Sequence, residues 1–171
     1  MKDLALKNYT FPTNFKPKSV LELGGGNGDE AHWVYDNLSK DITMVDKKKT
    51  KNTLNDINFI EGDYFNPNII ESLSSYDLII SNFTLCFNSR ENLEKFLPLY
   101  IWRINKGGIF YISDFNKHEQ VVTKRTDLSD SWFQEIFEKF FDKVIIKNQE
   151  IFEPAHSHTH NIFEMVCVGK K

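Results

Sequence analysis

The sequence predicts an α/β protein with a doubly wound, Rossmann-like sheet. Short apolar, β-rich runs alternate along the chain with amphipathic stretches of helical spacing, a pattern typical of βαβ units and hence of parallel strands. The runs are apolar at successive positions, as expected for strands that helices cover on both faces. Only a short connection separates the last two runs, so we expect them to form an antiparallel hairpin at one edge of the sheet.

The expected sheet has five or six parallel strands followed by the antiparallel hairpin strand. The apolar runs that mark its strands are Val20–Leu23, Ile42–Val45, Ile57–Ile60, Asp77–Ser81, Ile109–Ile112, Val144–Ile146 and Ile162–Val168. Helices are expected over 29–38, from a cap at Ser89 to about Asn105, and from a capping box formed by Ser131 and Gln134. The pair Gly107-Gly108 is expected to end the second of these helices.

The chain is expected to be a single domain with a short covering segment. Its 171 residues and 20.1 kDa are close to the usual size of one domain. Residues 18–171 are assigned to that domain. Residues 1–17, which include Pro12 and Pro17 and are therefore a poor long helix, are assigned to an N-terminal segment that folds over the ligand pocket.

The composition argues against several classes of protein. A formal net charge of −3 and a pI near 6.0 give no electrostatic reason to expect a nucleic-acid partner. No apolar run approaches the ~18 residues of a membrane span, and the first residues form no signal-peptide pattern. The two cysteines, Cys86 and Cys167, form neither a CxxC motif nor a disulfide framework. We therefore expect a cytoplasmic protein with no membrane partner.

A glycine-rich loop follows the first expected strand. Its residues are Glu22, Leu23, Gly24, Gly25, Gly26, Asn27 and Gly28. Glycines at such a position let the backbone turn tightly and approach a ligand closely beside a helix N-terminus. Ligands of open α/β sheets bind at the carboxyl ends of the strands, so this loop is expected to be part of a binding site.

The same loop also fits a looser dinucleotide-binding motif. Gly26, Gly28 and Ala31 match the GxGxx(G/A) spacing, and Asp46 lies 20 residues after Gly26, as that motif expects. Against a dinucleotide, the acid Glu22 at the strand end would repel a pyrophosphate. The sequence also has no Tyr-x-x-x-Lys pair and no room for a second catalytic domain. A nicotinamide-dependent oxidoreductase is therefore the alternative function.

Five features occur along the chain in the order and spacing of one enzyme superfamily. They are the Glu22–Gly28 loop, Asp46 after the second strand, the Gly62-Asp63 pair after the third, the Tyr76–Asn82 strand and the Gly107-Gly108 pair. From about Lys18 onward the sequence thus resembles the class I S-adenosylmethionine-dependent methyltransferases. The resemblance implies the strand order 3-2-1-4-5-7-6 and S-adenosylmethionine as cofactor. This cofactor has no phosphates and carries sulfonium and ammonium cations, which suit a loop flanked by carboxylates.

The resemblance also implies which residues bind the cofactor. The set is Glu22, Gly24, Gly25, Gly26, Gly28, Asp46, Lys47, Asp63, Tyr64, Asn82 and Phe83. Asp46 is expected to accept hydrogen bonds from both ribose hydroxyls, since a carboxylate offers two acceptors side by side. Asp63 is expected to accept from the adenine amino group, with Tyr64 or Phe65 beside the ring. Asn82 and Phe83 are expected to border the methionine moiety and the reaction site.

Three of the five histidines stand at alternate positions near the expected hairpin turn. In an extended segment this spacing points His156, His158 and His160 in one direction. Three roles are open for these histidines. They are solvated residues of the turn, or general bases or substrate-orienting groups, for which an ordinary pKa of ~6.5 is suitable, or ligands of a transition metal. No acid or cysteine at short spacing completes a metal site, so no metal is assigned. His156, His158 and His118, which follows the fifth strand, are the candidate catalytic residues.

The expected activity is methyl transfer to a small-molecule acceptor by in-line displacement. The superfamily's nucleobase-amine branches carry an Asn/Asp-Pro-Pro-Tyr/Phe box after the fourth strand, whereas this chain has Asn82-Phe83-Thr84-Leu85. Methylation of a base amine is therefore not expected, and the compact length favours a small acceptor. The short chain and its histidine-bearing hairpin are similar to the tellurite-resistance and thiol-type branch. A non-catalytic, cofactor-binding module that regulates a partner is a second alternative.

Overall fold

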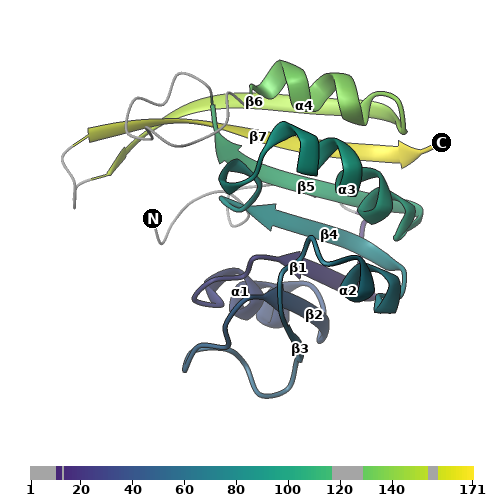
Figure 1. Ribbon diagram of the computed structural model, residues 1–171, viewed down its shortest axis with the longest axis vertical. Helices are drawn as coiled ribbons and strands as arrows, with labels where there is room; N and C mark the ends of the chain where they lie inside the picture. The colour runs from purple at the N-terminus through teal and green to yellow at the C-terminus, as the bar shows by residue number, and fades with distance from the viewer. Residues whose placement is uncertain (1–10, 13, 117–128, 154–157) are drawn as a thin grey trace.

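The computed structural model describes residues 11–12, 14–116, 129–153 and 158–171. In this part of the chain, seven strands form one sheet in the order β3-β2-β1-β4-β5-β7-β6 (Figure 1). The strands are β1 (Ser19–Leu23), β2 (Asp41–Asp46), β3 (Asn58–Glu61), β4 (Tyr76–Asn82), β5 (Ile104–Phe115), β6 (Phe141–Glu153) and β7 (His158–Lys170). The expected α/β class and strand order are confirmed.

The sheet is parallel except at its C-terminal edge. Strands β1 to β5 pair in parallel, whereas β7 is antiparallel to both β5 and β6. Because β7 is antiparallel to both of its neighbours, β6 runs in the same direction as β1 to β5. The end of β6 and the start of β7 therefore lie at the carboxyl edge of the parallel strands. Both hairpin strands continue past the end of β5, because Ile162 is the last β7 partner of that strand (Figure 1). The predicted antiparallel hairpin is thus confirmed.

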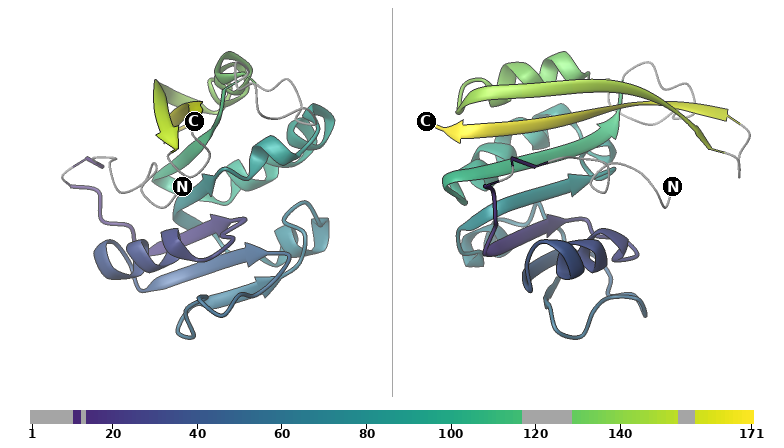
Figure 2. Two further views of the ribbon diagram at one scale, coloured as in Figure 1. Left: turned by 90° about the vertical axis from the view of Figure 1, so that its left-hand side faces the viewer. Right: turned by 180° about the vertical axis from the view of Figure 1, so that it is seen from behind.

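Helices cover the sheet on both faces. They are α1 (Asp29–Asn37), α2 (Pro67–Ser72), α3 (Arg90–Trp102) and α4 (Asp130–Phe137), with a short 3-10 helix η2 (Leu85–Phe87). Side chains of α2, α3 and α4 pack into one hydrophobic cluster, and those of α1 into a second cluster on the opposite face. The right-hand panel of Figure 2 shows α1 in front of the sheet, with the other helices behind it. This arrangement buries both faces of the central strands, as their continuous apolar sequence requires.

The described part of the N-terminal segment packs on the α1 face. The rings of Phe11 and Phe15 stack at a centroid distance of 5.6 Å, and Phe11 lies 6.4 Å from the ring of Tyr111 in β5. Phe11 and Phe15 both pack against the cluster that contains α1. The assignment of residues 1–17 to a covering segment stays a prediction, because residues 1–10 and 13 lie outside the described residues.

Two predicted helix boundaries are wrong. The cap of α4 is Ser129, whose hydroxyl oxygen accepts from the backbone N–H of Trp132 at 3.2 Å, so the proposed capping box at Ser131 does not start the helix. Helix α3 ends at Trp102, and β5 begins two residues later, so Gly107-Gly108 lies inside a strand. At Gly108 a Cβ atom would lie 2.8 Å from the carbonyl oxygen of Asp77, so the glycine allows close approach to β4.

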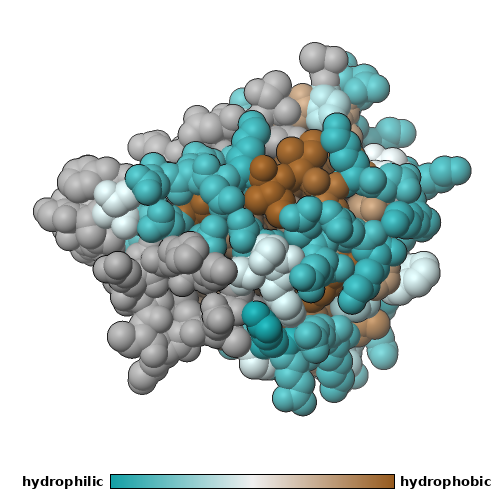
Figure 3. Space-filling view, turned by 90° about the horizontal axis from the view of Figure 1, so that it is seen from above, coloured by the Kyte–Doolittle hydropathy of each residue, from teal (hydrophilic) through white to brown (hydrophobic). Residues whose placement is uncertain are grey.

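Strand β6 forms one of the two edges of the sheet. Its exposed positions carry polar side chains such as Lys143, Lys147 and Asn148. Figure 3, which views the molecule from this side, shows a mostly hydrophilic surface with a large hydrophobic area near its centre and smaller ones elsewhere. Charged side chains on an edge strand discourage pairing with another chain.

Candidate functional site

The glycine-rich loop approaches its neighbours more closely than side chains would allow. At Gly24, where φ is +67°, a Cβ atom would lie 2.4 Å from Thr84 Cγ2. At Gly25 it would lie 2.2 Å from Met44 Cε. The backbone N–H of Gly24 donates to the carbonyl of Val45 at 2.8 Å, which extends the β1–β2 pairing into the loop. The loop is therefore a bare backbone cradle between the ends of β1, β2 and β4.

Asp46 holds this loop from the end of β2. Its Oδ2 accepts a hydrogen bond of 2.8 Å from the backbone N–H of Gly26, and its Oδ1 accepts one of 3.2 Å from the N–H of Lys48. Each carboxylate oxygen has two lone pairs, so both retain capacity for a further donor. Asp46 is thus a loop-positioning residue whose carboxylate also faces the adjoining cavity.

A cavity of about 380 Å³ opens beside the loop at the carboxyl edge of the sheet. Its lining residues are Gly24, Gly26, Asp46, Lys47, Tyr64, Phe83, Thr84 and Phe87. Six of them belong to the predicted cofactor-binding set. The structure therefore brings together residues from three separate strand ends and the glycine loop, which is the arrangement that the sequence predicted.

Two predicted residues, Glu22 and Asn82, lie beneath the loop rather than in the cavity lining. Glu22 is 2% exposed, and its Oε2 has no hydrogen-bond partner in the described part of the chain. Asn82 donates from Nδ2 to Glu30 Oε1 at 2.6 Å, whereas its buried Oδ1 has no partner among the same residues. Buried polar atoms are nearly always hydrogen-bonded, so a water molecule or a ligand group can serve these two oxygens.

The electrostatic surroundings of Glu22 favour a positively charged ligand. Burial first, and then the neighbouring carboxylates of Glu30, Asp46 and Asp29 in that order, together raise the pKa of Glu22 to about 8. Glu22 therefore keeps its proton near neutral pH, and a cation placed beside it would favour its ionised form. An ammonium or sulfonium group fits this acid-rich pocket, whereas a pyrophosphate would be repelled.

Asp63 lies at the far side of the site, after β3. Its Oδ1 accepts from the backbone N–H of Phe65 at 2.9 Å, and its Oδ2 lies 3.3 Å from Lys47 Nζ. Both side chains of this ion pair are more than half exposed, so the pair contributes little to stability. Gly28 precedes α1 with φ +82°, away from the cavity lining. The predicted contact of Asp63 with adenine stays a prediction.

Sequence reasoning missed two residues of the cavity, Thr84 and Phe87. The Thr84 hydroxyl donates to Gly24 O at 3.2 Å and to Asn82 O at 3.0 Å, which ties the loop after β4 to the glycine cradle. Phe87 is 68% exposed, an unusual exposure for a phenylalanine. The sequence could have indicated Thr84 and Phe87 only through their position just after the fourth strand. In the structure, Phe83 in the same segment has a left-handed φ of +49°. Non-glycine residues in that conformation cluster at functional sites.

Tyr64 supports the same loop from below. Its hydroxyl donates to Thr84 O at 3.1 Å and accepts from Asn88 Nδ2 at 2.7 Å. Burial raises the pKa of Tyr64 to about 12, so the phenol stays protonated and keeps donating. The aromatic edge of the cavity is thus fixed by hydrogen bonds, consistent with a flat ligand ring beside it.

The structure describes only some of the histidines that the sequence analysis singled out. His118 and His156 lie outside the described residues. The backbone of His158 pairs with Glu153 in the hairpin. His160, two positions further along β7, is 5% exposed and its ring lies 5.2 Å from that of Phe115. Among the residues with described positions, no group of three or more histidines, cysteines and acids is gathered closely enough to hold a metal ion.

Comparison with known sequences matches the chain to one family. The model of a methyltransferase domain matches residues 4–157. The phosphoethanolamine N-methyltransferase of Triticum aestivum is 25% identical over 163 residues, which cover 91% of this chain and 32% of that protein. A second wheat protein, phosphoethanolamine N-methyltransferase 1, is 23% identical over 168 residues and covers 92% of this chain. The chain thus spans about a third of the length of these curated relatives.

Solved structures share the fold. TehB from Haemophilus influenzae superposes with a TM-score of 0.69 at 18% identity, over 92% of this chain and 59% of that one. The N-methyltransferase NodS from Bradyrhizobium japonicum WM9, in complex with S-adenosyl-L-homocysteine, gives 0.73 at 11% identity, over 91% and 80%. In the described part of the chain, no helix is long and apolar enough to cross a lipid bilayer. Since the family model matches most of its length, this chain belongs to the methyltransferase-domain family.

Proposed function

We propose that the chain transfers a methyl group from S-adenosylmethionine to a small-molecule acceptor. The observation that carries this proposal is the cavity at the carboxyl edge of the sheet, which Gly24, Gly26 and Asp46 line beside a loop with no room for side chains. The carboxylates around this loop favour a cationic cofactor over the pyrophosphate of a nicotinamide dinucleotide. Family membership favours the same choice over the alternative oxidoreductase. The proposal is of a cytoplasmic protein without a nucleic-acid partner, and the net charge of −3 gives no general attraction for a nucleic acid.

Different residues of the site would bind different parts of such a cofactor. The cradle of Gly24, Gly25 and Gly26 would hold the methionine end, with Glu22 and Asn82 supporting the loop from beneath. Asp46 would accept from the ribose hydroxyls while it continues to hold Gly26. Asp63 would accept from the adenine amino group, and Tyr64 and the exposed Phe87 would flank the ring.

The bound cofactor supplies an already activated methyl group on a sulfonium. The protein then has to align the acceptor atom with the methyl–sulfur bond and exclude water. The acceptor atom would take the methyl group through its own lone pair, and the electrons of the broken carbon–sulfur bond would remain on sulfur. The acceptor's proton leaves to a base or to solvent. The names of the two wheat relatives, both phosphoethanolamine N-methyltransferases, support a small acceptor.

Calorimetric titration tests the proposal directly. We expect S-adenosylmethionine to bind with a 1:1 stoichiometry and NAD not to bind. With a pool of small acceptors, the enzyme should release S-adenosylhomocysteine, which a regulatory module would not do. Binding of NAD in preference to S-adenosylmethionine would refute the proposal, and cofactor binding without any product would favour the non-catalytic alternative.

Replacement of Asp46 by alanine is expected to weaken cofactor binding by about 1–3 kcal/mol, because charge-assisted hydrogen bonds to the ribose are lost. That corresponds to a rise in Kd of about 5- to 150-fold. Asp41→Ala, at the opposite end of β2, is the matched control and should leave Kd unchanged. Isothermal titration calorimetry measures both variants, and an unaltered Kd in Asp46→Ala would contradict the assignment.

Replacement of the three hairpin histidines together is expected to lower turnover and to spare cofactor affinity. The topology places the β6–β7 connection at the same sheet edge as the glycine loop, where an acceptor would enter. Comparison of kcat with the calorimetric Kd in the His156→Ala/His158→Ala/His160→Ala variant separates the two effects. His32→Ala, on α1, serves as the control. Normal turnover in the triple variant would remove these histidines from the mechanism.

A further inference from the structure

Asp114 is a buried acid near the end of β5. It is 1% exposed. Phe110 and Ile112, four and two positions earlier, belong to the hydrophobic cluster into which α2, α3 and α4 pack, and side chains alternate along a strand, so Asp114 lies on the same face of the sheet. A carboxylate is costly to bury unless hydrogen bonds satisfy it. The groups that donate to Asp114 therefore indicate its role.

The carboxylate of Asp114 caps the short helix η2 from a distant strand. Its Oδ2 accepts from the backbone N–H of Cys86 at 2.8 Å, and its Oδ1 accepts from the N–H of Phe115 at 2.8 Å. The first N–H groups of a helical turn have no partner within the turn. Thr84, the residue before η2, directs its hydroxyl to Gly24 O at 3.2 Å rather than capping the helix. Asp114 thus supplies the acceptor that the local sequence does not.

Helix η2 carries part of the cavity beside the glycine loop. Phe87, its last residue, lines that cavity, and so does Thr84 directly before the helix. Cys86, which donates to Asp114, lies between these two residues in the sequence and is 4% exposed. Asp114 itself is not a lining residue. A shift of η2 away from Asp114 would therefore move the two lining residues together.

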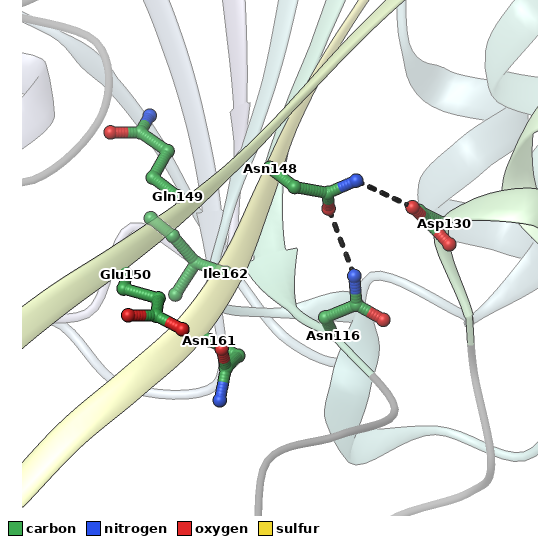
Figure 4. Close-up of a pocket in the computed structure, with 7 residues that line it drawn as sticks. All are labelled: Asn116, Asp130, Asn148, Gln149, Glu150, Asn161 and Ile162. Carbon is green, nitrogen blue, oxygen red and sulfur yellow. Dashed lines mark hydrogen bonds between the residues drawn. The ribbon is translucent and has the colours of Figure 1, made fainter.

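The end of β5 is a fixed support for this cap. The backbone N–H of Asn116, two positions after Asp114, donates to Asn161 O at 2.9 Å. Asn116 Nδ2 donates to Asn148 Oδ1 at 2.9 Å, and Asn148 Nδ2 donates to Asp130 Oδ2 at 2.9 Å, as Figure 4 shows. These side chains line a polar cavity of about 570 Å³ and tie the end of β5 to the hairpin and to α4. The backbone that carries Asp114 is thus held independently of η2.

We propose that Asp114 is a positioning residue for the cofactor. By holding the N–H of Cys86, it fixes η2 so that the ring of Phe87 stands beside the bound cofactor. A carboxylate suits this role, because hydrogen bonds to an ionised acceptor are stronger than those between neutral groups. The inference rests on the proposed function and adds to its site a residue outside the cavity.

A double-mutant cycle tests the proposal. The proteins are the wild type, Asp114→Ala, Phe87→Ala and the double variant, because Phe87→Ala removes the ring through which Asp114 acts. Asp77→Ala is the matched control, since Asp77 Oδ2 also accepts a backbone N–H, that of Lys18 at 2.8 Å, but at the opposite edge of the sheet. Calorimetry with S-adenosylhomocysteine gives Kd and stoichiometry, and thermal unfolding of the same samples gives stability.

We expect Asp114→Ala to raise the Kd about tenfold in the wild-type background and less than about twofold in the Phe87→Ala background, with the stoichiometry unchanged. The loss of thermal stability should be similar in both backgrounds, because the hydrogen bond to Cys86 is removed in each. The control should also lose stability but keep its Kd within about twofold of the wild type. A residue with a merely structural role would change stability without this coupling in Kd.

The proposal is overturned if Asp114→Ala leaves the Kd unchanged, or if it raises the Kd equally in both backgrounds. Should Asp114→Ala fail to fold, Asp114→Asn, which keeps one accepting oxygen, takes its place in the same cycle with the same criteria. Failure of the proposed function has a different signature, since S-adenosylhomocysteine would then not bind the wild type, and both proposals would fall.

Discussion

Replacement of Glu22 by glutamine is expected to remove a large part of the pH dependence of stability between about pH 5 and pH 8. In the unfolded chain this carboxyl ionises near its ordinary pKa of 4.5, whereas in the fold burial raises the pKa to about 8. Between these values unfolding releases a proton, so the wild type loses stability as the pH rises, by up to about 1.4 kcal/mol per pH unit. The glutamine variant has no proton to release at this position.

Urea unfolding of both proteins from pH 4 to pH 9 measures the effect. The quantity to plot is the free energy of unfolding of the variant minus that of the wild type. This difference should be constant below about pH 4.5, increase between about pH 4.5 and pH 8, and be constant again above about pH 8. The exposed Glu61→Gln, at the end of β3, is the control and should follow the wild type. Parallel curves for Glu22→Gln and the wild type would show that Glu22 is ionised in the fold.

Replacement of Gly24 by alanine is expected to destabilise the fold by about 2–5 kcal/mol and to abolish cofactor binding. A Cβ atom at a left-handed φ accounts for about 1–2 kcal/mol. Displacing Thr84, whose Cγ2 would lie 2.4 Å away, adds about 1–3 kcal/mol. Thr84 cannot rotate freely, because its hydroxyl is hydrogen-bonded to the carbonyls of Gly24 and Asn82.

Gly107→Ala separates the two contributions. Gly107 has a comparable φ of +82°, but a Cβ atom there would meet nothing within 4 Å. This variant should therefore show only the backbone contribution and keep full cofactor affinity. Chemical denaturation and calorimetry measure both quantities. If Gly24→Ala is no less stable than Gly107→Ala, the close contact with Thr84 is not a constraint on the loop.

Much of the fold was predictable because strands and helices leave local patterns. The apolar runs and the helical spacing between them each involve neighbours within a few residues, and they placed all seven strands. The helix α2 also had a local signal that the prediction did not use. Asn66 caps it through a hydrogen bond from the Asn68 N–H, and Pro67 occupies its first position. The error at Ser131 arose because a second capping residue, Ser129, stands two positions earlier. The error at Gly107 arose because β5 begins already at Ile104, which pairs with the distant Tyr76 of β4.

The binding edge was predictable for a topological reason. Glycines after the first strand and acids after the second and third must gather at one edge when those strands are parallel and adjacent. Asp46 and the glycine loop accordingly meet through the hydrogen bond to Gly26. No knowledge of side-chain packing was needed for this conclusion.

The sequence by itself thus determined the strands, the glycine loop and the acids that surround it, and the resemblance to the methyltransferase superfamily implied the strand order. Only the tertiary structure decided that Glu22 is fully buried and protonated, that Thr84 holds Gly24, and that Asp130 and Asn148 share a polar cavity. These features depend on pairs such as Gly24 and Thr84, 60 positions apart, or Asp130 and Asn148, 18 positions apart. Desolvation and contact over such separations are set by how the elements pack, which no local pattern encodes.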